Sequence, residues 1–139
     1  MPTTRALLVD DLGVLTAHPS LAPVVTRARA AGVLTAVVSN ADGPPRPGLS
    51  DLTDVTVLSG ETGLRKPDPA IFALAAARLG VLPQHCVFVD DLAANVRGAV
   101  AAGMVGVHHT DFSRTVDELE ILLGVRLREW SHDGSTQPP

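Results

Sequence analysis

Three pairs of polar residues each lie at the end of a short apolar run of this sequence, and a lysine lies between the second and third pairs. The residues are Asp10 and Asp11, Ser39 and Asn40, Lys66, and Asp90 and Asp91. Carboxylates crowded together repel one another, and they are tolerated mainly where a divalent cation or a lysine neutralises them. Carboxylates with Mg²⁺, a lysine and a hydroxyl–amide pair are the components of a phosphoryl-transfer site. The residue types therefore indicate such a site, if the fold brings the groups together.

The elements that would position these groups alternate between apolar runs rich in Val and Leu and longer alanine-rich stretches with helical spacing. Strands are predicted over Ala6 to Val9, Leu34 to Ser39, Val55 to Leu58, Cys86 to Val89 and Met104 to Val107. Helices are predicted over about Leu21 to Ala31, Pro69 to Leu79, Leu92 to Ala102 and Thr115 to Leu123. Because the strand runs are apolar throughout, each is expected to be covered on both faces, as in a parallel sheet. The order of elements predicts an α/β fold, a three-layer α/β/α sandwich with a Rossmann-like, open, parallel five-stranded sheet.

Ligands of such sheets bind beyond the carboxyl ends of the strands, which is where the polar pairs fall. Local signals agree with the element boundaries: Gly32, Gly80 and Gly103 each follow a predicted helix, where a left-handed residue is favoured. Asp68 precedes Pro69, so a capping carboxylate and a first-turn proline would begin the second helix. The proline-rich stretch 41–50 is predicted to be a loop or a broken short helix.

Length and composition limit the class of protein. The chain has 139 residues, enough for one domain, which we expect over residues 1–130 with a disordered tail over 131–139. The formal charge is −4 and no segment gathers positive charge, so nucleic-acid binding is not expected. Only 3% of residues are aromatic, which disfavours a base-stacking surface. A single cysteine, no apolar run long enough to cross a membrane and no signal-peptide pattern favour a cytoplasmic protein.

Four segments together resemble a known family. LLVDDLGVL, VVSNAD, GLRKPDPAIF and VFVDDLAANVRGAVAAGM resemble, in this order, the four motifs of the haloacid dehalogenase superfamily, most of whose members are aspartate-nucleophile phosphatases. The resemblance extends over about residues 6 to 109 and is nearest to the subfamily of the N-terminal phosphatase-like domain of epoxide hydrolases. The third and fourth motifs are the most specific.

The resemblance implies a role for each matching residue. Asp10 would be the nucleophile that forms an aspartyl-phosphate. Ser39 and Asn40 would hydrogen-bond the phosphoryl oxygens. Lys66 would neutralise charge on the transferring group and keep Asp10 ionised.

The resemblance also implies a Mg²⁺ site. Asp10, Asp90 and the backbone carbonyl of Leu12 would bind the ion directly. Asp91 would act through water or from outside the ligand set, Asp11 would support the loop in the same indirect way, and Asn95 would brace the acidic loop.

One motif residue departs from the family's phosphatases, which carry a second aspartate two residues after the nucleophile. That aspartate protonates the leaving group and later activates water, but Leu12 occupies its position here. General acid–base catalysis is typically worth about 10²–10⁴-fold in rate. Asp11 is not expected to substitute, because neighbouring residues of an extended strand face opposite ways. Leu12 could instead pack under the loop.

A second departure is size. Relatives insert a helical cap domain after the first motif, whereas 28 residues separate Asp10 from Ser39, enough for a turn, one helix and one strand. The site is therefore expected to be capless, and open to a large phosphorylated substrate or to closure by a second subunit.

Three functions remain open at this point. The first is a Mg²⁺-dependent phosphate-ester hydrolase with unusual proton transfer. The second is a regulatory module that binds phosphate and metal without turnover. The third, suggested by Leu12, is a dehalogenase-like enzyme.

Outside the site, Cys86 is expected to be buried. His108 and His109 are expected to be a surface pair rather than metal ligands. Trp130 and the helix from Val116 to Leu123 are expected to cover the sheet.

Overall fold

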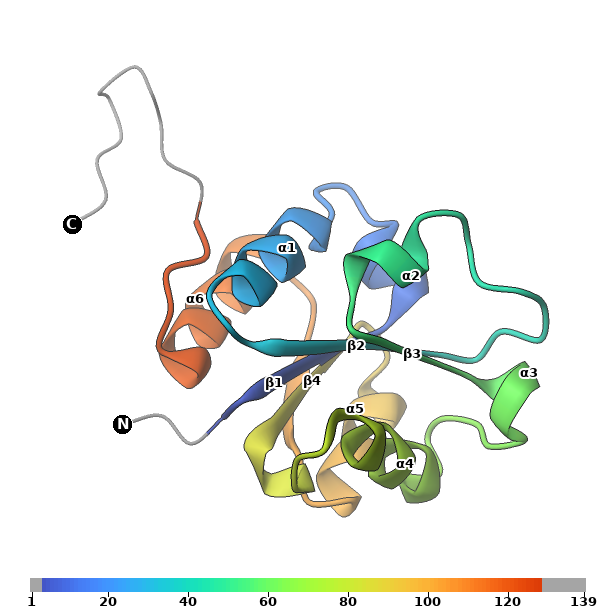
Figure 1. Cartoon of the computed structure of the whole chain (residues 1–139). Coiled ribbons are helices and arrows are strands. Elements are labelled where there is room, and N and C mark those ends of the chain that lie inside the picture. The colour runs from blue at the N-terminus through green and yellow to red at the C-terminus, as the bar shows by residue number, and fades with distance from the viewer. Residues whose placement is uncertain (1–3, 129–139) are drawn as a thin grey trace, which may run out of the picture.

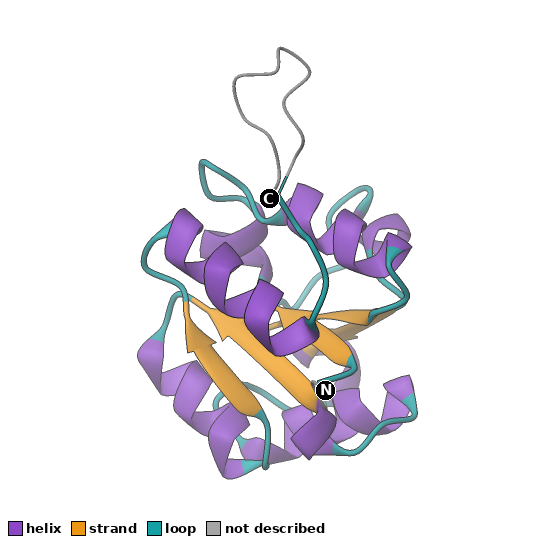
Figure 2. Cartoon of the chain, turned by 90° about the vertical axis from the view of Figure 1, so that its left-hand side faces the viewer, coloured by secondary structure: helices purple, strands orange, loops and turns teal. Residues whose placement is uncertain are grey.

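The computed structural model describes residues 4–128, in which a five-stranded parallel sheet lies between two layers of helices (Figure 1, Figure 2). The strands are β1 (Ala6–Val9), β2 (Leu34–Ser39), β3 (Val55–Leu58), β4 (Cys86–Asp90) and β5 (Val105–His108). Their order across the sheet is β3-β2-β1-β4-β5, and all neighbours pair in parallel. The predicted fold class is therefore confirmed.

The alternation of side chains along each strand divides the core in two. In β1, Leu7 and Val9 pack into one apolar cluster, while Ala6 and Leu8 pack into the other. The first cluster lies under α1 (Ala22–Ala30) and α6 (Phe112–Leu123). The second lies under α4 (Pro69–Leu79) and α5 (Ala93–Ala101), on the opposite face in Figure 1. Burial on both faces explains why the strand sequences are apolar throughout.

Five elements differ from the sequence prediction in their bounds, and α1 and α5 do so by only one residue at each end. β4 continues to Asp90. β5 begins at Val105 and ends at His108, each one residue later than expected. α6 begins at Phe112 rather than Thr115, because the Asp111 carboxylate caps it and accepts a hydrogen bond from the Arg114 N–H at 3.0 Å. An aspartate before a helical run is a usable cap signal, and Asp111 is one.

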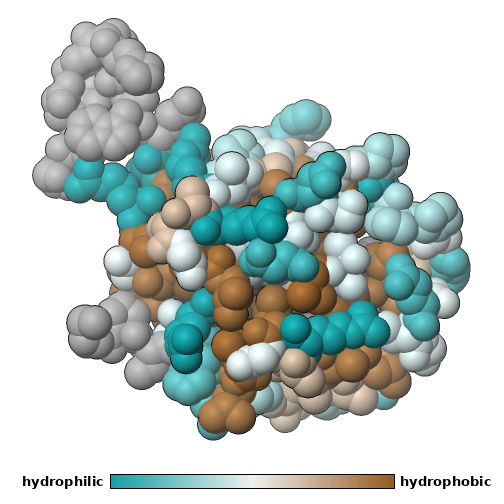
Figure 3. All heavy atoms as spheres, in the orientation of Figure 1, coloured by the Kyte–Doolittle hydropathy of each residue, from teal (hydrophilic) through white to brown (hydrophobic). Residues whose placement is uncertain are grey.

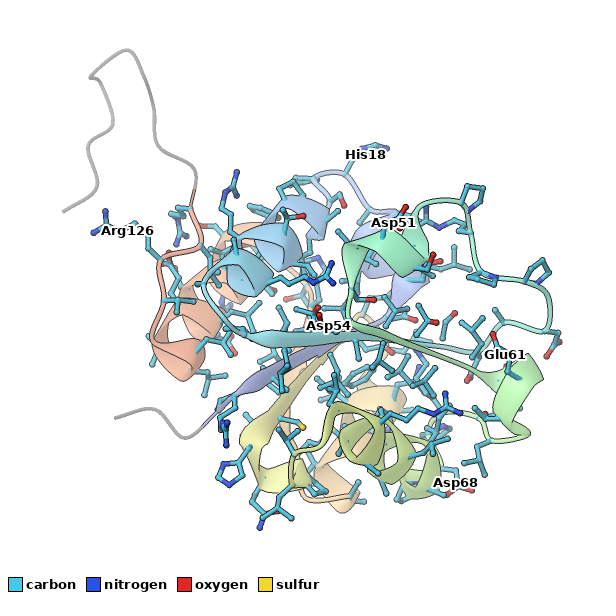
Figure 4. All side chains as sticks on the ribbon, viewed as in Figure 1. His18, Asp51, Asp54, Glu61, Asp68 and Arg126 are labelled. Carbon is cyan, nitrogen blue, oxygen red and sulfur yellow. The ribbon has the colours of Figure 1, made fainter. Side chains whose placement is uncertain are left out.

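The ends of α4 match the prediction. The Asp68 carboxylate accepts a hydrogen bond from the Ala70 N–H at 3.0 Å, and Pro69 occupies the first turn. Asp68 is labelled at the start of this helix in Figure 4. Gly80 ends the helix with a φ of +74°. α4 is therefore bounded on both sides by local chemistry that the sequence shows.

The segment between β2 and α4 contains two short helices. α2 (Leu49–Leu52) follows the proline-rich loop, and α3 (Ser59–Thr62), which was not predicted, follows β3. A 3-10 turn, η2 (Pro83–His85), precedes β4.

At the start of β3, Asp54 (Figure 4) accepts hydrogen bonds from the Thr35 N–H at 2.8 Å and from Arg29 Nε at 3.0 Å. Burial alone would raise the pKa of Asp54, but these donors lower it below its ordinary value.

On the face shown in Figure 3, hydrophilic and hydrophobic side chains are interspersed. Among the helices of residues 4–128, none combines the length and the hydrophobicity needed to cross a membrane. Trp130 and the tail 131–139 lie outside the described residues, so the expectations for them are not tested.

Candidate active site

The carboxyl ends of β1, β2 and β4 meet at one edge of the sheet. Asp10 directly follows β1, and its N–H donates to the Val89 carbonyl of β4 at 3.0 Å. Beside them lies a cavity of about 340 Å³. Its lining residues are Asp10, Leu12, Gly13, Ser39, Asn40, Lys66, Asp91, Leu92 and Asn95. The structure thus brings together the residues that the sequence placed in the site, except that Asp11 and Asp90 do not line the cavity.

Lys66 is the only lysine of the sequence and is buried at the centre of the site. Its Nζ donates to Asp10 Oδ1 at 2.6 Å and to Asp90 Oδ2 at 3.0 Å, and it lies 5.5 Å from the centre of the Phe88 ring. Burial raises the pKa of Asp10 to about 6, and the Lys66 ammonium opposes that rise. One cation therefore neutralises part of the charge of two buried carboxylates.

Asn40 fixes the backbone at Lys66. The Asn40 side-chain oxygen accepts from the Lys66 N–H at 2.8 Å, and its amide nitrogen donates to the Lys66 carbonyl at 3.0 Å. This double hydrogen bond joins the end of β2 to the segment before α4, so that the lysine projects onto Asp10. The predicted contact between the Asn40 amide and a phosphoryl group would compete with these bonds. Ser39, also buried, lines the cavity beside it.

The two acids that follow Val89 have opposite environments. Asp90 is fully buried, and both of its oxygens accept hydrogen bonds: Oδ1 from the Leu92 N–H, and Oδ2 from Lys66 and from Asn95 Nδ2, each at 3.0 Å. Burial alone would raise the pKa of Asp90, but Lys66 and these donors hold it below its ordinary value. Asn95 therefore contacts one of the acids of the loop that it was predicted to brace.

Asp91 is exposed and lines the cavity, and burial together with the adjacent Asp90 carboxylate raises its pKa. The exposed His108, at the end of β5, contacts the Asp91 carbonyl through Nε2 at 2.9 Å. His109 instead contacts Thr115 Oγ1 through Nδ1 at 2.7 Å. The sequence analysis expected Asp90 to face the ion and Asp91 to lie outside it. In the structure Asp91 lines the cavity, whereas both oxygens of Asp90 accept hydrogen bonds, from the Leu92 N–H, Lys66 and Asn95.

A tight turn, η1 (Asp11–Leu15), follows Asp10. Gly13 has a φ of +88°, and a Cβ built on it would lie 2.4 Å from Asp91 Oδ2. A glycine is therefore needed here both for the backbone and for the close approach of Asp91. Leu12 is 68% exposed, so the suggestion that it packs under the loop is wrong.

Arg46, in the proline-rich loop, contacts the site although no sequence motif includes it. Its Nε donates to both oxygens of Asp11, at 3.1 and 3.0 Å. Asp11 is buried and Arg46 is exposed. Their ion pair links the loop after β2 to the turn after β1. Nothing local in the sequence pairs these residues, which are 35 positions apart.

The carboxylates of the site are close enough to share a cation. One oxygen each of Asp10, Asp90 and Asp91 lies within 4.8 Å of the others. Hard oxygen donors of this kind are what Mg²⁺ prefers. Because Lys66 supplies a single positive charge against three carboxylates, the donor set fits a divalent cation.

Comparison with known proteins agrees with this geometry. The model of the haloacid dehalogenase-like hydrolases matches residues 5–103. Phosphatase MT3486 of Mycobacterium tuberculosis is 39% identical over 103 residues, which cover 69% of this chain and 48% of that protein. (S)-2-haloacid dehalogenase 1 of Pseudomonas sp. (strain CBS-3) is 33% identical over 102 residues, covering 69% and 45%. The chain thus spans less than half the length of these curated relatives.

A solved structure of similar extent is that of an uncharacterized protein from Corynebacterium glutamicum. It superimposes with a TM-score of 0.82 at 36% identity, over 91% of this chain and 99% of that one. The fold, the four motifs and the family match therefore lead to one conclusion: the chain belongs to the haloacid dehalogenase-like hydrolases.

Proposed function

We propose that this protein hydrolyses phosphate monoesters through an aspartyl-phosphate on Asp10. The observation that carries the proposal is the position of the Asp10 carboxylate, which lines an open cavity while Lys66 contacts it at 2.6 Å. An oxygen of Asp10 attacks phosphorus, and the P–O bond of the ester breaks with its electron pair moving to the leaving oxygen. Water then attacks phosphorus, which releases phosphate, restores the carboxylate and delivers a proton to solvent.

The acids of the site support a Mg²⁺ requirement. Asp10, Asp91 and the backbone carbonyl of Leu12 would hold the ion, which supplies positive charge beside the transferring phosphoryl group. Assigning Asp91 rather than Asp90 follows from their environments, since only Asp91 lines the cavity. Asp90 then acts as a positioning residue that orients Lys66 and Asn95.

The cavity is open because only η1 and α1 lie between β1 and β2 in the described chain. We propose that residues 4–128 form one capless core domain. An uncapped rim is accessible to a phosphorylated substrate larger than the cavity, and to a covering subunit. The phosphatase among the curated relatives supports the reaction class, over the part of its length that aligns.

The test is turnover of a panel of phosphate esters by the purified protein with Mg²⁺, with Asp10→Asn as the control. Hydrolysis that requires both Mg²⁺ and Asp10 is expected. Stabilisation by Mg²⁺ or phosphate without hydrolysis would contradict the proposal and favour a regulatory binding module. Activity that is unchanged in Asp10→Asn would exclude Asp10 as the nucleophile.

A second candidate, dehalogenation of 2-haloacids, is favoured by Leu12. Halide leaves carbon without needing a proton, so a missing acid at this position would not slow the first step of that reaction. Asp10 would displace halide from carbon to form an ester, and water would hydrolyse the ester. The aligned (S)-2-haloacid dehalogenase supports this class. Halide release without added metal would establish it, and no release in an assay that detects a positive-control dehalogenase would remove it.

A further inference from the structure

The cavity beside Asp10 has an apolar rim. Leu12 and Leu92 both line it, and their exposed fractions are 68% and 58%. They project from the turns that follow β1 and β4, on which the acids also lie. When a bound ligand covers large exposed apolar side chains, binding becomes more favourable by about 25 cal/mol for each Å² of apolar surface removed from water.

The same cavity has little to offer a second anionic group. Among its described lining residues Lys66 is the only cation, and it already contacts Asp10 and Asp90. Arg46, in the loop after β2, is paired with Asp11, and Arg65, next to Lys66 in the chain, is paired with Asp42. A substrate carrying a carboxylate or second phosphate would therefore leave that charge beside leucine side chains without a counter-ion.

The described lining residues also hold no free proton donor for a leaving group. The titratable ones are Asp10, Lys66 and Asp91. Under the proposed function Asp10 attacks, Asp91 binds the ion, and Lys66 is held by two carboxylates. Leu12, which lines the cavity two residues after Asp10, carries no titratable proton. Ester cleavage is then fast only when the leaving oxygen departs as a stabilised anion.

We propose that the substrate is an aryl phosphate monoester, a single phosphate on an apolar group that departs as a stabilised oxyanion. This inference rests on the proposed function and narrows it to one substrate class. In the first step an Asp10 oxygen forms a bond to phosphorus, and the bond between phosphorus and the aryl oxygen breaks. The aryl oxide carries away the electron pair and takes its proton from water, while Leu12 and Leu92 contact the ring.

The apolar part of the proposal is tested by binding, without turnover. Calorimetry in Mg²⁺ would compare phenylphosphonate, methylphosphonate and phosphonoacetate. Phenylphosphonate is expected to bind about tenfold tighter than methylphosphonate, since covering some tens of Å² of apolar surface is worth about 1.4 kcal/mol. Phosphonoacetate is expected to gain nothing over methylphosphonate.

Substitution assigns the gain to the rim. Leu12→Ser with Leu92→Ser should remove most of the tenfold preference. Leu82→Ser is a matched control, because Leu82 is 57% exposed but precedes η2 and does not line the cavity, and it should keep the preference. Two results with the native protein would each overturn the proposal. One is equal affinity for phenylphosphonate and methylphosphonate, and the other is a higher affinity for phosphonoacetate than for methylphosphonate.

The leaving-group part is tested by kinetics on two esters with similar apolar tails, 4-nitrophenyl phosphate and 2-phenylethyl phosphate. The ratio of their kcat/KM values is expected to exceed about 10², and Leu12→Asp should narrow it by accelerating the alkyl ester. Similar rates for the two esters overturn this proposal and leave phosphate hydrolysis standing. No turnover of either ester contradicts the proposed function itself.

Discussion

Lys66 determines whether two buried carboxylates can coexist at the end of the sheet. Its ammonium contacts both Asp10 and Asp90, and its side chain is only 2% exposed. Removing one partner of a buried ion pair leaves uncompensated charge in a region of low dielectric constant. The lysine is therefore as important for the stability of the fold as for the proposed reaction.

Replacing Lys66 with Met should lower the free energy of unfolding by about 3 kcal/mol or more, because Asp10 and Asp90 lose their shared cation. Urea denaturation at neutral pH measures the change. The neighbouring Arg65→Ala is the control: Arg65 pairs with Asp42 at 3.4 Å on the surface, and its loss should cost no more than about 0.5 kcal/mol. A loss for Lys66→Met as small as that of the control would contradict the account.

Cys86 offers a second prediction at this scale. Burial raises the pKa of its thiol from 9.0 to about 11, so the thiol stays protonated and covered in the folded protein. Its contribution to stability is full below about pH 9 and is lost as the pH rises towards 11. At pH 8 the folded protein should resist a disulfide reagent that labels one thiol after unfolding. Rapid labelling of the native protein would show that the strand opens.

The sequence predicted the members of the site better than their roles. Asp10, Ser39, Lys66 and Asn95 were identified from their positions at strand ends and in motifs. The different environments of Asp90 and Asp91 were not predicted, because the two acids are adjacent in the sequence and only the contacts with Lys66, Leu92 and Asn95 distinguish them. Arg46 could not be found, since its partner Asp11 is distant in the chain and the loop between them has no regular period.

At the scale of elements, the η1 turn positions the edge of the proposed metal site through Gly13. Its left-handed φ alone would cost an alanine roughly 1–2 kcal/mol. In addition, an alanine Cβ would lie 2.4 Å from Asp91 Oδ2 and must displace that carboxylate. The turn therefore couples the backbone after β1 to the acid after β4.

Gly13→Ala should both destabilise the protein and remove most of its stabilisation by Mg²⁺, as measured by thermal unfolding with and without the ion. Gly32→Ala is a matched control, because Gly32 also has a positive φ, +94°, but nothing lies within 4 Å of an added Cβ. It should be destabilised to a similar extent by backbone strain while keeping the response to Mg²⁺. An intact response in Gly13→Ala would contradict the role given to Asp91.

Regular elements were predictable where periodicity and caps are local. Three of the strands and α4 have the predicted bounds, since continuous apolar runs and the Asp68–Pro69 cap mark them directly. The short helices α2 and α3 and the η1 turn were not predictable with bounds, because segments of four or five residues are held by tertiary contacts such as Arg46 with Asp11.

At the scale of the whole molecule, the parallel sheet gathers its charged groups at one edge. Asp10, Asp90 and Asp91 face a single lysine there, so the fold retains a local excess of negative charge that a divalent cation relieves. A ligand that binds only the folded state stabilises it by about 2.7 kcal/mol at 100 times its dissociation constant.

Mg²⁺ should therefore raise the melting temperature in a saturable way, and chelation should reverse the rise. Asp91→Asn should weaken the response strongly. Asp117→Asn, which removes an acid with a 61% exposed side chain on α6, should leave it unchanged. A response of equal size in both variants would show that the ion acts through general surface charge.

The most direct test of the central claim is to trap the phosphorylated enzyme. The protein would be mixed with Mg²⁺ and 4-nitrophenyl phosphate, quenched rapidly in acid and mapped by peptide mass spectrometry. We predict one phosphoryl group on Asp10, accompanied by an initial release of nitrophenolate equivalent to the enzyme, because no acid–base residue at position 12 speeds the second step. Asp10→Asn should show neither. Turnover without phosphorylation of Asp10, or turnover that survives in Asp10→Asn, would contradict the account.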